Sequence, residues 1–500
     1  MQQKPIEKVQ NNWWSKLDWA GMEGSIRRMQ FRIFKATREG DSKRAKHLMK
    51  LLARSWTAKV LAIRAVTQLN KGKVTPGIDG EVYLKDEDRM ALARECFDYR
   101  TWRFQPALRR YIPKPVNPGA PRDIPVKLRP LSIMAIKDRV IATIVSYPLN
   151  AQWEAWFESN VFGFRPGRCT QDAIRLIQEK LSQRDMAILD ADIKSFFDMV
   201  KHNAILSRVT CFKDFIKNNL MAGVVERGRI TRPATGIMQG SPLSPILANI
   251  ALHGLEKRIE RENSACVIRY ADDLVVLAPT KRDMVQQVIP CLVTFLAERG
   301  LELKQEKTRI TTRREGFNFL GFTIEKPRIK LFVKPQKEKL LRFLTHIREI
   351  IKENKQVAQR TLIARLNPVM SGWTTYYKYS DAYAAFAKVD SEIWRMLWRW
   401  ARRRHPNKGR KWVAAKYFHV VGNQTWMFKD ADTGISLKSA RAASRGKYGF
   451  VVGQLSPLDG SPASIKAWSR RKQNEVLHAL EQSANGKARL PSGCYLPSGR

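Results

Sequence analysis

The apolar positions of this chain follow a helical period in its first and later parts. Apolar residues three or four positions apart, laced with Lys and Arg, predict amphipathic helices over most of residues 1–75 and over 281–299. The same period returns from Gln336 to Lys355, where one face carries Leu340, Leu344, Ile347 and Ile351. The pattern predicts a helical start and a second helical region after about residue 330.

The centre of the chain has short continuous apolar runs of the kind that buried strands have. Met186 to Ile193 predicts one such strand, with Asp192 near its carboxyl end. Two further runs, Val267-Ile268 and Leu274 to Leu277, flank an acidic segment and predict two strands joined by a tight turn. Turn formers at 75–80 and a proline-rich basic stretch at 110–130 predict loops and extended segments. Together the runs indicate a multidomain α+β fold.

The charge balance narrows the class of function. The 500 residues include 90 Lys or Arg and 46 Asp or Glu, which gives a formal net charge of +44. Basic residues spread along the whole chain predict a polyanionic partner. Nucleic acid fits better than a membrane, because no apolar run reaches the length of a spanning helix. The alternative is a passive basic protein, against which the hydrophobic content of 44% weighs.

The cysteines and the start of the chain indicate the compartment. Six Cys are scattered singly without a C-x-x-C pair, so neither a zinc site nor a disulfide framework is predicted. The first residues, from Met1 to Pro5, are not typical of a signal peptide. We therefore expect a cytoplasmic protein, in a bacterial cytoplasm or nucleoid, with no membrane partner.

The acidic turn carries the candidate chemistry. Tyr270-Ala271-Asp272-Asp273 places two adjacent carboxylates at a hairpin tip, where they repel each other unless a cation lies between them. Hard oxygen ligands of this kind suit Mg²⁺, which usually completes its shell with water and substrate phosphates. The turn is thus a candidate centre for nucleotidyl transfer. A solvated acidic turn is an equally good interpretation of the tetrapeptide alone.

Asp192 supplies a third carboxylate. Phosphoryl transfer with two metal ions needs acidic ligands that hold the ions about 3.5–4 Å apart. Asp192 and Asp272 can converge if their strands lie side by side in one sheet.

Two further segments have plausible roles beside such a centre. A bulky ring at Phe197 would exclude a 2′-hydroxyl from the nucleotide sugar, although Phe196-Phe197 is also compatible with a core aromatic pair. The loop from Thr235 to Pro245 holds Gln239 and Gly240, and its small residues allow a nucleic-acid backbone or base pair to approach closely. As an isolated loop it would be a routine helix entry.

A set of motifs in order along the chain resembles group II intron-encoded reverse transcriptases, also called maturases. The resemblance spans roughly residues 55 to 415. Its motifs are Arg129-Pro130-Leu131-Ser132-Ile133, Phe162-Gly163-Phe164-Arg165-Pro166-Gly167-Arg168, Asp192-Ile193-Lys194-Ser195-Phe196-Phe197-Asp198, Gln239-Gly240-Ser241-Pro242-Leu243-Ser244-Pro245, Tyr270-Ala271-Asp272-Asp273, Leu301 to Thr308, Phe319-Leu320-Gly321-Phe322, and Leu366-Asn367-Pro368 through Ser371 to Tyr377.

The resemblance implies a right-hand polymerase with fingers, a palm built on an antiparallel sheet, and a helical thumb or maturase domain. It makes Asp192, Asp272 and Asp273 the catalytic carboxylates, with two Mg²⁺ ions held by Asp192, Ile193, Asp272 and Asp273. For the dNTP and the primer–template it implies contacts from Arg129, Lys127, Phe197, Gln239, Gly240, Tyr270, Lys304 and Lys307. For the three lysines, a solvated side chain would look the same.

The resemblance also divides the chain. It implies a basic helical extension at 1–80, reverse transcriptase fingers and palm at 81–330, a thumb or maturase domain at 331–415 and a small DNA-binding region at 416–500. From Arg395 to Lys416, basic residues interleave with Trp as in nucleic-acid-binding surfaces. Trp394 and Trp398, at i and i+4, favour a place in the thumb core instead.

Many relatives end in an HNH nuclease with paired Cys and His ligands. Here only His478 and Cys494 stand near the end, so we expect no zinc site of that type and no cleavage of the second DNA strand.

The first hypothesis is an RNA-directed DNA polymerase that binds its own intron RNA, assists splicing as a lariat ribonucleoprotein and copies the intron at target DNA. Competing hypotheses are a splicing-only RNA-binding maturase with a vestigial polymerase, and a domesticated or defence reverse transcriptase.

Overall fold

The chain begins with a group of packed helices. The computed structural model describes residues 13–113, 128–422, 424–443, 448–451 and 453–472. Side chains of Asp18, Asp41 and Ser55 cap the first three helices by accepting main-chain N–H bonds of 2.9–3.0 Å. The group consists of α1 (Trp19–Arg38), α2 (Ser42–Ala53), α3 (Trp56–Arg64), α4 (Asp86–Arg94) and the later α5 (Ile136–Glu154). The predicted helical start is confirmed.

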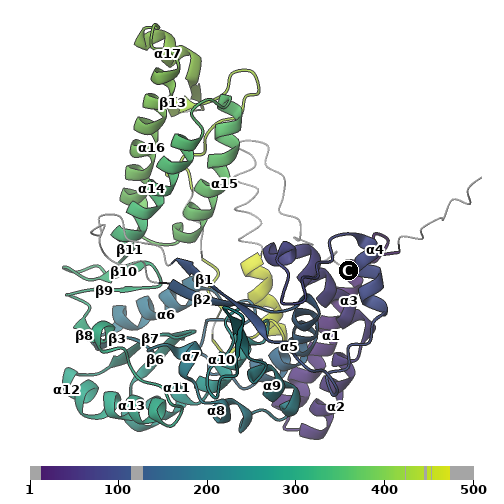
Figure 1. The fold of residues 1–500 in the computed structure, drawn as a ribbon. Coiled ribbons are helices and arrows are strands. Elements are labelled where there is room, and N and C mark those ends of the chain that lie inside the picture. Colours follow the sequence, from purple (N-terminus) through teal and green to yellow (C-terminus); the bar gives the residue numbers. More distant parts are fainter. Residues whose placement is uncertain (1–12, 114–127, 423, 444–447, 452, 473–500) are drawn as a thin grey trace, which may run out of the picture.

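A first sheet follows these helices, in the order β2-β1-β4-β5. Strand β1 pairs antiparallel with β2 and parallel with β4, so two distant segments meet beside the helical group (Figure 1). Its strands are β1 (Ala107–Pro113), β2 (Leu128–Ile133), β4 (Val224–Glu226) and β5 (Arg229–Thr231).

The central sheet has the order β6-β7-β3-β8, and all its neighbours are antiparallel. Its strands are β3 (Ala187–Asp192), β6 (Cys266–Tyr270), β7 (Asp273–Ala278) and β8 (Arg309–Thr312). Helix α6 (Thr170–Gln183) precedes this sheet in the chain. The helices between its strands are α7 (Phe196–Met199), α8 (His202–Leu206), α9 (Lys213–Leu220), α10 (Ser244–Leu252), α11 (Leu255–Asn263), α12 (Lys281–Asp283) and α13 (Ile289–Ala297).

Both faces of the central sheet are buried, against different cores. In β3, Leu189 and Ala191 belong to a core shared with the amino-terminal helices, whereas Ile188, together with Met186 just before the strand, belongs to a second core shared with the later helices. Alternate residues of a strand face opposite sides, so the sheet lies between two hydrophobic layers.

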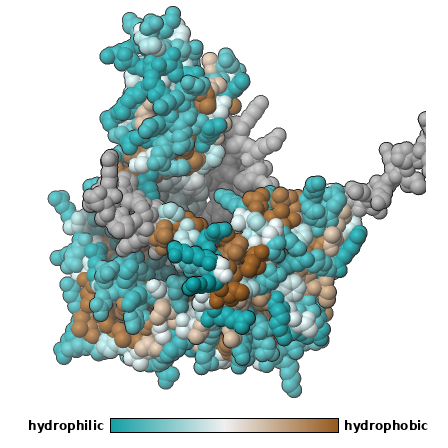
Figure 2. All heavy atoms as spheres, viewed as in Figure 1, coloured by the Kyte–Doolittle hydropathy of each residue, from teal (hydrophilic) through white to brown (hydrophobic). Residues whose placement is uncertain are grey.

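A third sheet, of three strands, and a helix bundle follow the central sheet. The sheet β9 (Phe317–Phe319), β10 (Phe322–Glu325) and β11 (Phe332–Pro335) leads into a bundle that rises from the body in Figure 1. The bundle consists of α14 (Lys337–Glu353), α15 (Gln359–Tyr377), α16 (Tyr383–Arg404) and α17 (Arg410–Tyr417), followed by the hairpin β12 (Phe418–Val421) and β13 (Gln424–Phe428). Most of its visible surface is hydrophilic (Figure 2).

The prediction that Trp394 and Trp398 lie in the core of this bundle is wrong for Trp394. Trp398 is half-buried and packs against the second core, but Trp394 is 36% exposed. The two rings stack on each other as i, i+4 neighbours, and one face of the pair stays at the surface.

Residues 448–472 return from the bundle to the body of the molecule. Arg168, just before α6, donates hydrogen bonds to the carbonyls of Val451, Gly453 and Leu455 at 2.8, 2.8 and 2.5 Å. This stretch, yellow in Figure 1, therefore packs against the helices and sheets that precede the bundle.

Candidate active site

One face of the central sheet changes along its length from apolar to acidic. Along β3 this face carries Ile188, then Asp190, then Asp192, and the apolar Met186 lies just before the strand. Asp192 lies directly opposite Asp273, the first residue of β7. Strands β3 and β7 therefore lie side by side. This is the condition that the sequence analysis set for Asp192 and the acidic turn to come together.

The turn between β6 and β7 consists of Ala271 and Asp272, because Tyr270 and Asp273 still pair across the hairpin. Ala271 takes a φ of +60°, a conformation that costs an L-residue energy. Gly163 lies so close to the main chain of Ala271 that a side chain there would collide with it. The surrounding chain thus holds a strained turn, which fixes Asp272 beside the paired Asp192 and Asp273.

Burial and neighbouring carboxylates raise the pKa of the two aspartates of the acidic turn. Burial first, and then the charges of Asp272 and Asp192, raise the pKa of Asp273 to about 6. The pKa of Asp272 is also raised, by burial and then by Asp192, while Arg129 and Lys307 act in the opposite direction. Concentrated negative charge of this kind favours a bound cation.

A lysine supplies positive charge to Asp192. The ammonium of Lys307, in the 3₁₀ turn Gln305–Lys307, lies 2.5 Å from Asp192 Oδ2, and this bond raises the pKa of Lys307. The Lys304 N–H donates to the Asp192 carbonyl oxygen at 2.8 Å, which ties the same segment to β3. The structure therefore brings Lys307 into the acidic site by its side chain and Lys304 by its main chain.

The donor set fits a divalent cation, although the carboxylates do not converge on a single point. Among the described residues, no three His, Cys, Asp or Glu side chains are gathered closely enough to hold a metal ion. The carboxylates that could serve as ligands are those of Asp192, Asp272 and Asp273, and Lys307 occupies Asp192 Oδ2 in this structure. Ile193 buries its side chain and bridges to Leu303, so it can offer such an ion only a main-chain carbonyl.

The predicted nucleotide-contacting residues come from the first sheet and the loop beside it. Arg129 is exposed on β2, and its charge lowers the pKa of Asp272, so it belongs to the electrostatic surroundings of the site. The Ser132 N–H at the end of β2 donates to the Gln239 carbonyl at 2.7 Å, which holds the loop against this strand. Gly240 has a φ of +113°, and a Cβ there would lie 2.5 Å from the Ser132 carbonyl oxygen. Lys127 lies outside the described residues.

The two aromatic candidates lie close to the carboxylates in the chain. Phe196 is buried in the core, and Phe197 packs edge-on against it with 5.3 Å between ring centroids. Phe197 is only half-buried, so part of its ring remains available beside the end of β3. Tyr270 is half-buried at the end of β6, on the same sheet face as Asp273.

Comparisons with known proteins match most of the chain to reverse transcriptase and maturase families. Three family descriptions match in succession: "N-terminal domain of reverse transcriptase" over residues 14–96, "Reverse transcriptase (RNA-dependent DNA polymerase)" over 112–324, and "Group II intron, maturase-specific domain" over 340–418. The maturase-specific match over 340–418 distinguishes group II intron reverse transcriptases from other reverse transcriptases. The chain belongs to the group II intron reverse transcriptase and maturase family.

Two of the curated relatives reported below carry maturase or group II intron names. "Maturase-like protein 1" of Euglena gracilis is 26% identical, with 72% of this chain and 77% of that protein covered. "Group II intron-encoded protein LtrA" of Lactococcus lactis is also 26% identical, and the match covers 51% of this chain and 53% of LtrA. "Protein YkfC" of Escherichia coli is 26% identical, over 61% of this chain and 89% of its own.

Among solved structures, telomerase from Candida albicans in complex with a fragment of telomeric RNA matches at 12% identity and a TM-score of 0.36, over 63% of this chain and 65% of that chain. This likeness is too distant to bear on function. Among the described helices of this reverse transcriptase family member, none has the length and apolar character needed to cross a bilayer.

Sequence reasoning missed one acidic residue of this group II intron reverse transcriptase. Asp190 lies two residues before Asp192, on the same sheet face, directly opposite Arg309 of β8. Burial raises the pKa of Asp190 to about 6, against the charges of Arg309 and Lys307. The alternation of the strand could have indicated Asp190, because any residue two positions from Asp192 shares its face.

Proposed function

We propose that this chain is an RNA-directed DNA polymerase that also binds group II intron RNA. The observation that supports the polymerase most directly is the register of β3 and β7, with Asp192 opposite Asp273 beside the Asp272 turn. Like charges facing each other in a sheet destabilise it, so their retention is best explained by a function that uses them.

The proposed chemistry is transfer of a nucleotide from a dNTP to a primer 3′ end. Two Mg²⁺ ions, when bound, would activate the attacking 3′-hydroxyl and stabilise the leaving pyrophosphate. Asp192, Asp272 and Asp273 bind the ions, with the main-chain carbonyl of Ile193 as a further ligand. Arg129 and Lys127 bind the triphosphate, since a guanidinium fork suits phosphate oxygens.

The remaining predicted residues position the sugar, the base pair and the strands. The ring of Phe197 excludes a 2′-hydroxyl, which makes the product DNA. Gln239, Gly240 and Tyr270 line the nascent pair, while Lys304 and Lys307 neutralise primer or template phosphates. The first sheet then corresponds to fingers, the central sheet to a palm and the helix bundle to a thumb.

The second part of the proposal is intron binding. The maturase-specific match and the net charge of +44 support a ribonucleoprotein with intron RNA, in which the protein assists splicing. We further propose that it copies the intron from a primer at target DNA.

Primer extension on poly(rA) with oligo(dT) tests the polymerase. We expect Mg²⁺-dependent synthesis that Asp272→Ala reduces by at least about 100-fold, as loss of a group acting only on the transition state does. Asp214→Ala, which changes an exposed carboxylate on α9, serves as the matched control and should extend normally. Extension by the Asp272→Ala protein at the wild-type rate would overturn the proposed role of the acidic turn.

The same preparations separate the polymerase from a splicing-only maturase. We expect Asp272→Ala to bind intron RNA and promote its splicing as the wild type does. Wild-type protein that binds RNA but extends no primer would favour the splicing-only alternative.

A further inference from the structure

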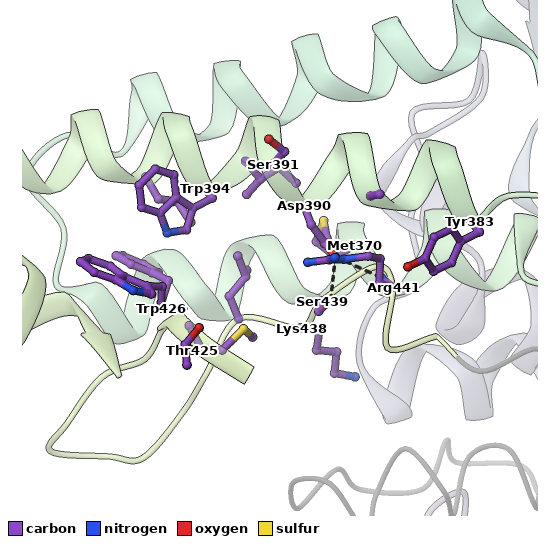
Figure 3. Close-up of a pocket in the computed structure, with 16 residues that line it drawn as sticks. Met370, Tyr383, Asp390, Ser391, Trp394, Thr425, Trp426, Lys438, Ser439 and Arg441 are labelled. Atoms are coloured by element: carbon purple, nitrogen blue, oxygen red, sulfur yellow. Dashed lines mark hydrogen bonds and ion pairs between the residues drawn. The ribbon is translucent and has the colours of Figure 1, made fainter. Parts of the chain in front are cut away.

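The helix bundle carries two adjoining cavities that share a pair of tryptophans. One, of about 790 Å³, lies between α16, β13 and residues 437–441. The other, of about 740 Å³, lies between α16 and α17. Trp394 and Trp426 line both, and Figure 3 shows the two rings at one end of the first cavity. Volumes of this size are typical of small-molecule and nucleotide sites.

Trp394 and Trp426 form the wall that the cavities share, and Trp398, which lines the second cavity, packs against both rings. Trp394 and Trp398 lie nearly parallel, with 5.7 Å between centroids and 7° between planes. Trp426 stands across both at 6.3 Å, with interplanar angles of 77° and 72°. Trp426 is 52% exposed and Trp394 36%, so flat aromatic faces remain open to a ligand. Exposed rings are costly in water unless a partner covers them.

A β-bulge directs Trp426 toward the cavities. His419 pairs with Met427 and Val421 with Gln424, so Thr425 and Trp426 together oppose the single residue Val420. Trp426 takes a φ of +62°, which a bulky side chain rarely adopts. Bulges of this kind re-aim a side chain, and the strain is tolerated where the new direction is used.

The rim of the aromatic wall is strongly basic. Arg402, Arg410 and Lys411 line the second cavity and are exposed. None of the three forms an ion pair with a carboxylate in the part of the chain that the structure describes. Their positive charge disfavours a cationic ligand and favours an anion. The exposed indole rings favour an anion that also contains a planar ring.

The wall of the first cavity is already fixed. The carboxylate of Asp390 on α16 accepts hydrogen bonds from the Ser439 hydroxyl at 2.6 Å and the Ala440 N–H at 2.7 Å. These bonds hold residues 439–441 against the helix, and little rearrangement is needed before a ligand enters. Preorganisation of this kind lowers the entropic cost of binding.

We propose that these tryptophans form a slot for an unpaired base of RNA. The base stacks on Trp394 and Trp426, and the flanking phosphates contact Arg402, Arg410 and Lys411. Stacking with phosphate neutralisation is the usual way in which proteins hold single-stranded nucleotides. The proposal rests on the RNA-binding part of the proposed function. RNA is favoured over DNA because Trp394 lies within the maturase-specific match and Trp426 follows it directly in the hairpin.

An RNA hairpin with one unpaired 2-aminopurine in its loop is the probe, because stacking on indole quenches its fluorescence. We expect the full chain to quench the probe and Trp426→Ala to bind it about tenfold more weakly, as loss of one stacked base would cause. Trp412→Ala is the control, since Trp412 is 40% exposed on α17 and lines neither cavity. It should bind like the wild type, and both variants should melt normally.

A second measurement uses the unaltered protein. The same hairpin is prepared with 5-iodouridine in the unpaired position, bound to the protein and irradiated. We expect the 5-iodouridine to crosslink to residues 394–398 or 424–428. The proposed RNA slot would be overturned if crosslinks formed exclusively elsewhere, or if the Trp426→Ala and Trp412→Ala proteins bound the probe with equal affinity. Tighter binding of the matching DNA hairpin would also overturn it. If the wild-type protein fails to extend oligo(dT) but still quenches the probe, the proposed polymerase activity is rejected and the proposed base-binding slot is not.

Discussion

At the scale of single residues, the proposed metal site predicts that proton binding and cation binding are coupled at the acidic face. Asp273 and Asp190 both have a pKa raised to about 6, chiefly by burial, and Asp190 itself contributes to the raised pKa of Asp273. A carboxylate with a raised pKa is ionised above that value and loses its charge as the pH falls through it. If the proposed Mg²⁺ ions bind here, protons and Mg²⁺ should compete for the same oxygens near pH 6.

We expect the Mg²⁺ concentration for half-maximal primer extension to rise as the pH falls below about 6. Displacement of one proton predicts a rise of about tenfold per pH unit. In Asp190→Asn the rise should begin at lower pH, because one charge that raises the pKa of Asp273 is gone. Asp214→Asn is the control. A Mg²⁺ requirement that stays constant with pH, or a shift of Asp190→Asn to higher pH, would contradict this competition.

The residues of the site differ in how far sequence could find them. The tetrapeptide Tyr270 to Asp273 and the strand end at Asp192 carry local signals, an acidic turn and an apolar run. Asp190 carries a weaker signal: alternation places it on the face of Asp192, but only the register opposite Arg309 shows which charges surround it. The exposed Trp394 was misplaced for the same kind of reason: i, i+4 spacing predicts contact between two rings and says nothing of which face is covered.

At the scale of elements, the positions of helices and strands along the chain were largely predictable from the sequence. Which strands pair with one another in the sheets was not. The apolar periods over 281–299 and 336–355 predicted helices that the structure contains at Lys281–Asp283 with Ile289–Ala297 and at Lys337–Glu353. The order β6-β7-β3-β8 joins segments far apart in the chain, which no local pattern encodes. The bulge at Trp426 likewise depends on pairing across a hairpin.

The contact between β2 and the Gln239 loop gives a test at this scale. Gly240→Ala would place a Cβ 2.5 Å from the Ser132 carbonyl oxygen, so the loop or β2, which carries Arg129, must move. We expect the KM for dNTP in primer extension to rise about tenfold, since small displacements of positioning groups have large kinetic effects. Gly254→Ala is the matched control: its φ of +93° brings similar backbone strain, but nothing lies within 4 Å of the added Cβ. Equal KM values for the two variants would contradict the expected coupling.

At the scale of the whole molecule, residues 448–472 connect parts that are distant in sequence. Gly453 packs against Ser159, Gly460 against Phe31 of α1, and Arg168 binds three carbonyls of the segment. In a chain of net charge +44, mutual repulsion opposes compactness, so contacts that join the helical start, the central body and the segment after the bundle matter more. The role of this segment in DNA binding stays a prediction.

A buried ion pair anchors that segment. Arg471 donates to both carboxylate oxygens of Asp172 at 3.2 and 3.1 Å, and Tyr448 donates to Asp172 Oδ1 at 2.6 Å. Asp172 is fully buried at the start of α6, so its charge depends on these partners. Removing one member of a buried pair typically costs about 3–5 kcal/mol, because the other charge stays behind in an apolar surrounding.

We therefore expect Arg471→Met to lower the stability of the full chain by about 3–5 kcal/mol and to expose residues 448–472 to limited proteolysis. Arg470→Met removes the same charge from an exposed neighbouring position and should change stability by less than about 0.5 kcal/mol. Thermal melting and tryptic digestion of the two variants make the comparison at equal net charge. If both melt and digest alike, the segment is held by its apolar contacts and by Arg168, and the Asp172 pair contributes nothing to the anchoring.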